Sequence, residues 1–195
     1  MTNAIILAAG LGSRFSPLTK NKPKSLIEFG KKTLLERIVE IFRKYGIDDI
    51  SIVTGYKKEK INLPNITYFE NKNYRENSTL SSLFCAQKKI SESTIITYSD
   101  IIFQENILKK LLDADYDISA VVDRKWIDYW KFRTGESIHD ATETAIFNEK
   151  NMIISIGEKN PHANGHFIGL MKLQNTGSEK FQEIYFKTRQ NCINN

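Results

Sequence analysis

Two glycines and a group of cations stand close together near the beginning of the chain. Gly10 and Gly12 end the apolar run AIILAA, and four cations follow within a dozen residues: Arg14, Lys20, Lys22 and Lys24. Glycine lets a ligand approach the main chain, so successive amide groups can converge on a phosphate. A guanidinium binds two phosphate oxygens, whereas an ammonium acts as a compact point charge. The stretch predicts a phosphate-binding loop in which Arg14 and Lys24 hold two ends of a triphosphate.

The two commoner phosphate loops do not match this stretch. A dinucleotide-binding loop requires G-x-G-x-x-G, but Phe15 occupies the position of the third glycine. A Walker loop requires G-x-x-x-x-G-K-[ST], and neither Gly10 nor Gly12 is followed in that way. What remains is G-x-G-x-R followed by P-L-T and P-K.

Composition limits the kind of protein that carries this loop. With 195 residues and 41% hydrophobic content, the chain suits one compact α/β domain. A net charge of +5 suits an anionic partner, but acidic residues are interspersed and no long basic block occurs. Phosphorylated small molecules are therefore favoured over nucleic acid. The apolar runs are too short for a membrane span, and AIILAA lacks the basic leader and the small-residue cleavage site of a signal peptide, which predicts a cytoplasmic protein. Cys85 and Cys192 form neither a ligand set nor a disulfide framework, and we expect Cys85 to be buried.

Strand-like and helix-like segments alternate through the first part of the chain. Thr33 is a candidate N-cap and Gly46 a natural end for the helix between them. Strands are expected at residues 4–9, 50–54, 65–70, 94–98 and 117–122, with further helices starting near Ser78 and running through 107–112. This alternation predicts a doubly wound, mostly parallel, Rossmann-like sheet. Such sheets bind ligands at the carboxyl ends of their strands.

The region after Asp123 departs from the alternation. Residues 124–139 are rich in aromatic side chains and show no sustained period, which predicts a long loop. Residues 142–148 and 152–157 resemble a β-hairpin, followed by a strand at 166–173 and a helix at 177–190. We interpret the chain as a single domain with a nucleotide-binding half, residues 1–123, and an acceptor-binding half, residues 124–195. The late hairpin is expected to form the acceptor side of the cleft.

The opening motif resembles that of the nucleotidyltransferases that join a nucleoside triphosphate to a phosphorylated acceptor and release pyrophosphate. Their signature, L-x-A-G-x-G-x-R followed by P-L-T and P-K, is matched by Leu7, Ala9, Gly10, Gly12, Arg14, Pro17, Leu18, Thr19, Pro23 and Lys24. The segments GYKKEKI, ENKNYRENSTLSSLF, YSDIIF and GHFIGL are most similar to those of small bacterial cytidylyltransferases.

The resemblance implies roles for individual residues. Arg14 would neutralise the departing pyrophosphate, Lys24 would bind the α-phosphate and Asp100 would hold Mg²⁺. Nucleotide contacts through the loop are implied for Leu7, Ala8, Ala9, Gly10, Gly12 and Ser13. Asp100 has an alternative interpretation as the N-terminal cap of the next helix. The family's second acidic metal ligand cannot be mapped. The chain is expected to be a form shortened at its C-terminus, and the alternatives are that the ligand comes from a different place in the chain or from a partner chain.

Base and acceptor recognition are implied less specifically. Cytosine would be contacted by Tyr56, Asn77, Ser78, Thr79 and Ser82, although turn and N-cap roles explain Ser78 and Thr79 equally well. Acceptor contacts are implied for Asp123, Trp126, Trp130, Glu158, Lys159 and His166. Aromatic faces and carboxylates suit a cationic amine. The alternatives are that the tryptophans fill hydrophobic space, that Lys159 is a solvated turn lysine and that His166 is structural.

These observations together predict a CTP-dependent cytidylyltransferase. It would join CMP to phosphoglutamine, phosphocholine or 2-aminoethylphosphonate, with Mg²⁺ as cofactor, for the modification of surface polysaccharide or capsule. Its partners would be CTP and the acceptor, with no nucleic acid and no membrane span. The alternatives are a sugar-1-phosphate nucleotidyltransferase and a nucleotide-binding module with weak catalysis.

Overall fold

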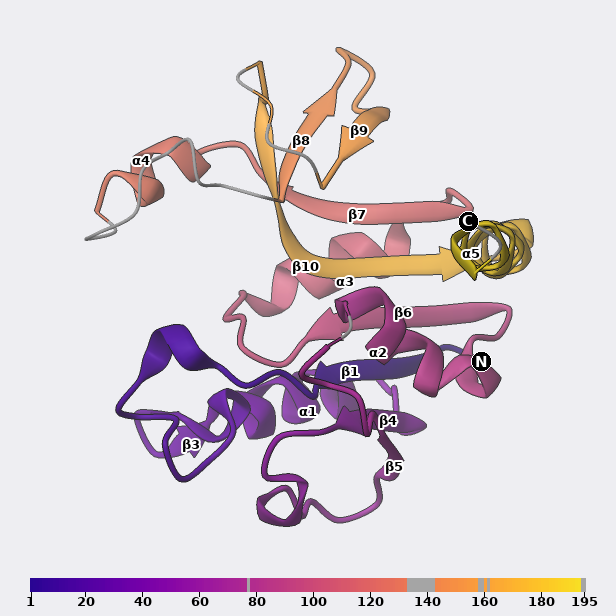
Figure 1. Ribbon diagram of the computed structural model, residues 1–195. Coiled ribbons are helices and arrows are strands. Elements are labelled where there is room, and N and C mark those ends of the chain that lie inside the picture. Colours follow the sequence, from indigo (N-terminus) through magenta and orange to yellow (C-terminus); the bar gives the residue numbers. More distant parts are fainter. Residues whose placement is uncertain (77, 133–142, 158–159, 161, 194–195) are drawn as a thin grey trace. The chain divides into compact units, whose positions relative to one another are not determined.

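The computed structural model describes residues 1–76, 78–132, 143–157, 160 and 162–193 (Figure 1). Contacts within the chain divide it into two compact units. Unit 1 consists of Met1–Ser119 together with Met171–Asn195, and unit 2 consists of Ala120–Leu170. The predicted nucleotide-binding half therefore falls almost wholly in unit 1. The end of the chain, which we assigned to the acceptor half, also belongs to unit 1.

A parallel sheet forms the centre of unit 1. Its strands, in the order β5-β4-β1-β6, are β5 (Thr67–Glu70), β4 (Ile50–Thr54), β1 (Asn3–Ala8) and β6 (Ser93–Tyr98). β1 pairs in parallel with both β4 and β6, and β4 pairs in parallel with β5. The final residues of β10 (Gly165–Gln174) come next to β6 in this order. The mostly parallel sheet predicted from the alternation is confirmed.

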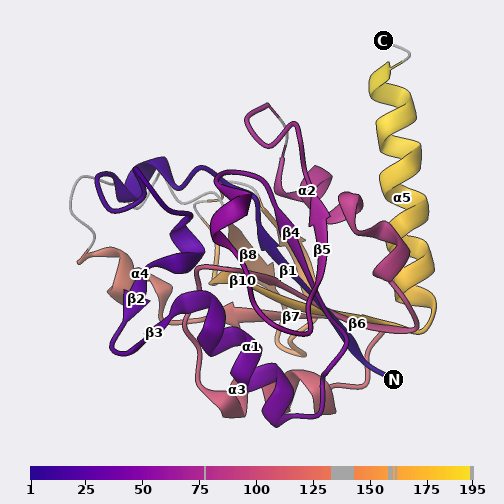
Figure 2. The ribbon, with the colours of Figure 1, turned by 90° about the horizontal axis from the view of Figure 1, so that it is seen from below.

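Helices cover both faces of this sheet. They are α1 (Leu34–Lys44), α2 (Thr79–Cys85), α3 (Glu105–Asp113) and α5 (Thr176–Ile193). Figure 2 shows α1 and α3 on one side of the sheet and α2 and α5 on the other. Within each pair, side chains connect the two helices. Lys44 of α1 forms an ion pair with Glu105 of α3, and the Phe84 ring of α2 stacks on Tyr185 of α5 with centroids 3.4 Å apart. The doubly wound arrangement is therefore confirmed.

The core is built from apolar residues of the predicted strands and helices. Ile5, Ile52 and Phe42 are fully buried between the sheet and its helices, as their spacing predicts. Leu80, in the first turn of α2, is 42% exposed. Cys85 is half-buried rather than buried, and the side chain of Cys192 lies outside the described part of the structure.

Lys172 is a buried cation that the sequence did not single out. Its Nζ donates to the carbonyl oxygen of Leu112 at 3.0 Å and to that of Ala114, at the C-terminus of α3. Positive charge is favourable at this end of a helix. Burial lowers the pKa of the Lys172 amine, an effect that the nearby Asp115 opposes. The contact fixes β10 to the end of α3.

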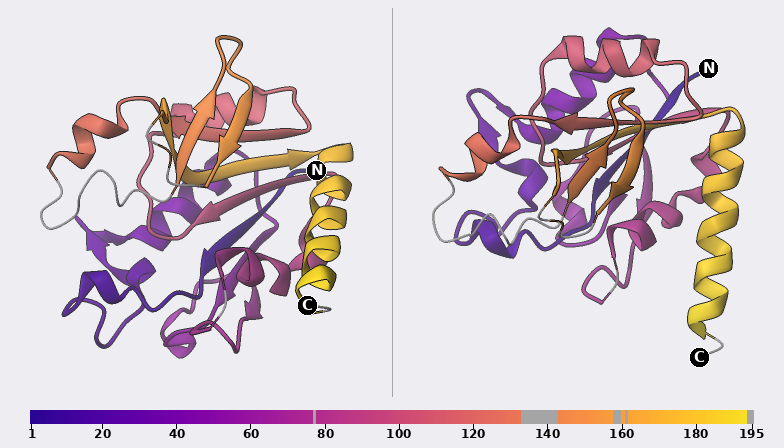
Figure 3. Two further views of the ribbon diagram at one scale, coloured as in Figure 1. Left: turned by 45° about the horizontal axis from the view of Figure 1, so that its top comes forward. Right: turned by 90° about the horizontal axis from the view of Figure 1, so that it is seen from above.

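Unit 2 contains a hairpin and a short helix. β8 (Thr144–Phe147) and β9 (Ile153–Ile156) pair in antiparallel fashion, which confirms the predicted hairpin (Figure 3). β7 (Ile118–Asp123) pairs with β10. The long loop predicted at 124–139 is wrong in part, because Trp126–Trp130 forms the helix α4. Its five residues are too few to show a helical period. Residues 133–142 lie outside the described residues.

None of the helices within the described part of the chain combines the length and the apolar character needed to cross a membrane. The cytoplasmic location inferred from the sequence remains a prediction.

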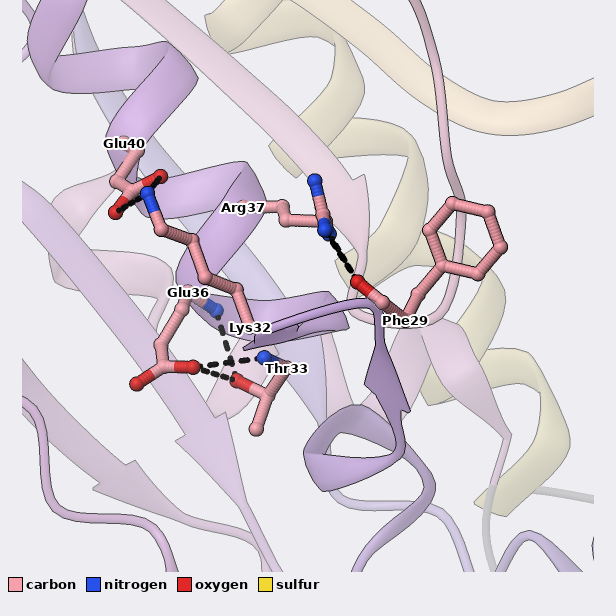
Figure 4. Close-up of polar contacts among 6 residues, drawn as sticks. All are labelled: Phe29, Lys32, Thr33, Glu36, Arg37 and Glu40. Carbon is pink, nitrogen blue, oxygen red and sulfur yellow. Dashed lines mark hydrogen bonds and ion pairs between the residues drawn. The ribbon is translucent and has the colours of Figure 1, made fainter.

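The start of α1 confirms the predicted cap. The Thr33 hydroxyl accepts from the Glu36 amide at 3.2 Å, and the Glu36 carboxylate accepts from the Thr33 amide at 2.7 Å (Figure 4). The bonds from the amide and hydroxyl of Thr33 lower the pKa of the Glu36 carboxyl below its ordinary 4.5. Stabilisation by Glu36 is therefore present above pH 4.5 and is lost as the pH falls through the lower pKa of the folded state.

Replacing the cap residue should weaken the first turn of α1. We expect Thr33→Ala to lower the free energy of unfolding at pH 7 by about 1 kcal/mol, since the helix loses the acceptor for its N-terminal amide. Urea denaturation measures the change. Thr33→Ser keeps the hydroxyl and serves as the control. Equal stability of Thr33→Ala and the wild-type chain would show that the cap contributes nothing.

Candidate functional site

The ends of three parallel strands place the glycine loop. The register sets Leu7 opposite Tyr98 and Ala8 opposite Thr54. Beyond the strands, the Tyr56 amide donates to the Ala9 carbonyl at 3.0 Å and the Ser99 amide donates to the Leu7 carbonyl at 3.2 Å. The loop that begins at Gly10 therefore leaves the sheet with the end of β4 on one side and the end of β6 on the other. This is the edge at which doubly wound sheets bind ligands.

The loop itself turns at Gly12. This residue has φ 63° and ψ 30°, the left-handed conformation that favours glycine. The short 3-10 helix η1 (Ser13–Phe15) follows. The Gly12 carbonyl accepts from the Phe15 amide at 2.9 Å and from the Thr19 hydroxyl at 2.8 Å. Two donors from different turns thus hold one carbonyl.

Lys24 and Asp100 form an ion pair at this edge. Lys24 Nζ contacts Asp100 Oδ2, and both side chains keep about a fifth of their surface exposed, 21% and 23%. Lys24 Nζ also lies 4.6 Å from the centroid of the Phe15 ring. A Cβ on Gly12 would lie 2.9 Å from Lys24 Cβ, so Gly12 leaves room for the lysine stem. Two residues far apart in the sequence are therefore brought together beside the glycine turn.

The alternative interpretation of Asp100 as a helix cap is wrong. The N-cap of α3 is Gln104, and Asp100 lies in the turn directly after β6. Its carboxylate faces Lys24 instead.

The other predicted loop residues differ in exposure. Ala8 and Ala9 are buried within the sheet edge, Leu7 is half-buried, and Gly10, Ser13 and Arg14 are exposed. A Cβ on Gly10 would meet no atom within 4 Å, so the main chain there is open to a ligand. The backbone geometry thus suits an anion approaching from the solvent side.

The predicted base-recognition residues divide into two groups. Ser78 is the N-cap of α2, where its hydroxyl accepts from the Ser81 amide at 3.2 Å, and Thr79 is exposed beside it. Ser82 is buried, and its hydroxyl accepts from Asn71 Nδ2 at 2.8 Å. Tyr56 directs its hydroxyl at main-chain carbonyls of the glycine loop. Asn77 lies outside the described residues.

The predicted acceptor residues that the structure describes lie in unit 2. Trp126 and Trp130 are buried and pack edge to face, and His166 lies against both, with ring centroids 5.7 and 5.5 Å away. The interpretation of the tryptophans as filling hydrophobic space describes this packing. Asp123 is half-buried, and its side chain accepts from the Lys125 amide at 2.8 Å. Glu158 and Lys159 lie outside the described residues.

Three contributors to the loop's environment were missed or given no role from the sequence. Phe15 provides the ring beneath Lys24, Thr19 holds Gly12, and buried Asn71 connects the end of β5 to α2. Thr19 belongs to the recognised P-L-T motif, but a motif does not say where a hydroxyl points. Phe15 was noted only as the residue that breaks a dinucleotide motif.

Comparison with known proteins defines the class of this chain. The profile of the MobA-like NTP transferase domain matches residues 4–149. That range contains the ends of β1, β4 and β6, the turn at Gly12, and Lys24. The chain belongs to this family of nucleotidyltransferases.

Among the relatives, cytidylyltransferases recur. The chain is 35% identical over 187 residues to the CTP:phosphoglutamine cytidylyltransferase of Campylobacter jejuni subsp. jejuni serotype O:2, covering 87% of this chain and 72% of that protein. It is 33% identical over 117 residues to a choline-phosphate cytidylyltransferase of Streptococcus pneumoniae, covering 58% of this chain and 51% of that protein. The predicted resemblance to bacterial cytidylyltransferases is confirmed.

A solved structure shares the fold. The CTP:phosphocholine cytidylyltransferase from Streptococcus pneumoniae superposes with a TM-score of 0.67 at 23% identity, covering 92% of this chain and 73% of that one. At this level of identity the match supports the α/β architecture.

Substitution of Gly12 should be costly for two separable reasons. Gly12→Ala forces a side chain into the left-handed region and against Lys24 Cβ. Gly46→Ala is the matched control, because Gly46 has φ +73° but a Cβ added there would meet no atom within 4 Å. We expect Gly46→Ala to lower the free energy of unfolding by about 1 kcal/mol and Gly12→Ala to lower it by about 1 kcal/mol more. Denaturation curves of both variants measure this difference. Equal losses of unfolding free energy would mean that the added methyl group does not clash with Lys24.

Proposed function

We propose that this chain transfers CMP from CTP to a small phosphorylated acceptor that carries nitrogen, with release of pyrophosphate. The observation that carries the proposal is the Lys24–Asp100 ion pair beside Gly12, at the carboxyl ends of β1 and β6. The relationship to CTP:phosphoglutamine cytidylyltransferase supports CTP as the donor and makes phosphoglutamine the first acceptor to test. Phosphocholine and 2-aminoethylphosphonate are the further candidates, since two relatives are named as cytidylyltransferases of these compounds.

The proposed reaction needs no nucleophile from the protein. An oxygen of the acceptor's phosphate or phosphonate attacks the α-phosphorus of CTP and forms a new P–O bond. The bond from the α-phosphorus to the oxygen bridging to the β-phosphate breaks, and pyrophosphate leaves with the electron pair. Positioning and neutralisation of charge provide the catalysis in such transfers. In this proposal Arg14 faces the pyrophosphate, Lys24 faces the α-phosphate, and the loop amides from Gly10 to Ser13 hold phosphate oxygens.

Recognition of the base and the acceptor is assigned more coarsely. Ser78 and Thr79 are exposed at the start of α2, where they can offer hydrogen bonds to cytosine. Ser82, which is buried and accepts a hydrogen bond from Asn71, would hold this part of α2 in place. For the acceptor, Asp123 is half-exposed and bears the negative charge that suits an amine. The buried Trp126 and Trp130 would shape that region through packing.

A divalent cation such as Mg²⁺ fits the residues present at Asp100. Within the described ranges no three His, Cys, Asp or Glu side chains gather into a metal-binding group. Mg²⁺ is commonly held by one or two carboxylates together with substrate phosphates and water. Asp100 alone would therefore bind the ion weakly, and the phosphates of the nucleotide would supply further ligands. When bound, the ion would neutralise charge on the phosphates.

An acceptor panel tests the proposal. The protein is incubated with CTP and Mg²⁺ and, in turn, phosphoglutamine, phosphocholine and 2-aminoethylphosphonate, while pyrophosphate is measured. Release that depends on one of these acceptors supports the proposal. Faster release from UTP or dTTP with glucose 1-phosphate would assign the chain to sugar nucleotides. Binding of CTP without release for any acceptor would indicate a binding module.

The two loop cations should be needed for turnover. We expect Arg14→Ala and Lys24→Ala each to reduce kcat/KM by about a hundredfold or more with the best acceptor, as loss of a preorganised charge contact does. Folded state is checked by circular dichroism and urea denaturation. Near-normal turnover in either variant would mean that the loop does not hold the triphosphate.

The ion pair also predicts competition between Lys24 and a metal ion for Asp100. Without nucleotide, Lys24→Met should strengthen Mn²⁺ binding by about two- to fivefold, the range expected for a partly exposed ion pair. Electron paramagnetic resonance of free Mn²⁺ measures it. Lys22→Met is the matched control, because it removes the same charge from the same loop without touching the pair.

An equal gain in Lys22→Met and Lys24→Met would show that only net charge matters. Asp100→Asn should abolish the binding in every background.

A further inference from the structure

The Tyr56 hydroxyl ties the end of β4 to the glycine loop. It lies 2.8 Å from the carbonyl oxygen of Lys20 and 3.1 Å from that of Thr19. A phenol carries a single O–H hydrogen, so the two carbonyls share one three-centre bond. The tyrosine thereby connects residues 19 and 20 of the loop to the end of the sheet.

The position of Tyr56 is itself set by close packing at the end of β4. Its amide donates to the Ala9 carbonyl at 3.0 Å. A Cβ on Gly55 would lie 2.7 Å from that same carbonyl oxygen and 2.8 Å from Tyr74 Cβ. Only glycine fits there, so the chain passes Ala9 closely and delivers the Tyr56 side chain to the loop. The anchor is therefore part of the rigid sheet edge.

Thr19 connects the Tyr56 hydroxyl to Gly12. It is 4% exposed, and its hydroxyl donates to the Gly12 carbonyl at 2.8 Å. Its carbonyl accepts from Tyr56, so its main chain faces the sheet while its side chain faces the turn. Gly12 in turn packs against the stem of Lys24, which pairs with Asp100. A continuous set of contacts runs from Tyr56 to the proposed catalytic lysine.

We infer that Tyr56 and Thr19 are positioning residues that hold the nucleotide loop in its binding conformation before CTP arrives. This rests on the proposed function, in which the phosphates of CTP occupy the loop. Neither hydroxyl has to touch the nucleotide, because each acts on a main-chain carbonyl of the loop. The structure thus gives the Tyr56 hydroxyl a role different from contact with the base.

Loss of a positioning bond has a recognisable kinetic pattern. A loop without its tether spends part of its time in conformations that bind poorly, and the apparent affinity falls by the competent fraction. Bound nucleotide then restores the loop through its own contacts. Removal of the hydroxyl should therefore raise the Kd and KM for CTP while kcat at saturating CTP stays near the wild-type value.

Tyr56→Phe tests this against a matched control in the same unit. The Tyr68 hydroxyl on β5 also bonds to main chain, accepting from the Leu63 amide at 2.7 Å, but Leu63 lies outside the glycine loop. We expect Tyr56→Phe to raise the Kd of CTP by about two- to tenfold, the effect of one hydrogen bond. Tyr68→Phe makes the same chemical change and should leave that Kd within about twofold of wild type, even if its urea midpoint falls equally. Titration calorimetry with CTP and Mg²⁺, without acceptor, measures both.

Thr19 provides an independent arm. Thr19→Val keeps the shape and removes the donor, whereas Thr19→Ser keeps the donor. We expect Thr19→Val to weaken CTP binding by a similar factor of about two to ten and Thr19→Ser to restore it. A merely structural role would affect the unfolding midpoint without separating valine from serine in CTP affinity.

The outcomes distinguish this inference from the function on which it rests. Wild-type protein that binds no CTP would overturn both. Wild-type binding that Tyr56→Phe and Tyr68→Phe weaken equally, or that neither weakens, would overturn the positioning role alone. A fall in kcat with unchanged KM for CTP would also contradict it, because that pattern marks a contact made only in the transition state.

Discussion

The ion pair between Lys24 and Asp100 is the interaction on which the remainder of the site depends. It joins the loop after β1 to the turn after β6, two segments that the parallel register of these strands brings to the same edge. Gly12, in a left-handed conformation, leaves space for the lysine stem of this pair. The sheet edge, the glycine turn and the ion pair therefore depend on one another. Together they fix the positions of the two charged groups.

The pairing also explains how two groups needed for different tasks coexist before substrate binds. In the proposed function, the Lys24 ammonium binds phosphate and the Asp100 carboxylate binds a metal ion, and without substrate the two groups pair with one another at the strand ends. Both side chains keep about a fifth of their surface exposed, so a ligand can reach the pair from solvent. Under this proposal, a nucleotide with its cation would supply both partners at once, which would couple binding of the two.

The fold and the reaction class could be predicted because their signals are local. Buried strands appear as apolar runs, the cap of α1 as Thr33 before an apolar helical face, and the phosphate loop as a spaced set of glycines and cations. The helix α4 was missed because five residues carry no period. The ion pair, the burial of Ser82 on Asn71 and the aim of the Tyr56 hydroxyl depend on contacts between distant segments, which spacing along the chain does not encode.

The most direct measurement of the central claim is a crystal structure of the chain with Mg²⁺ and an α,β-methylene analogue of CTP, which cannot release pyrophosphate. The account predicts phosphate oxygens on the amides between Gly10 and Ser13, with Lys24 withdrawn from Asp100 to the α-phosphate and the metal ion in its place. A nucleotide bound elsewhere on the sheet, or one bound with the Lys24–Asp100 pair intact, would contradict it.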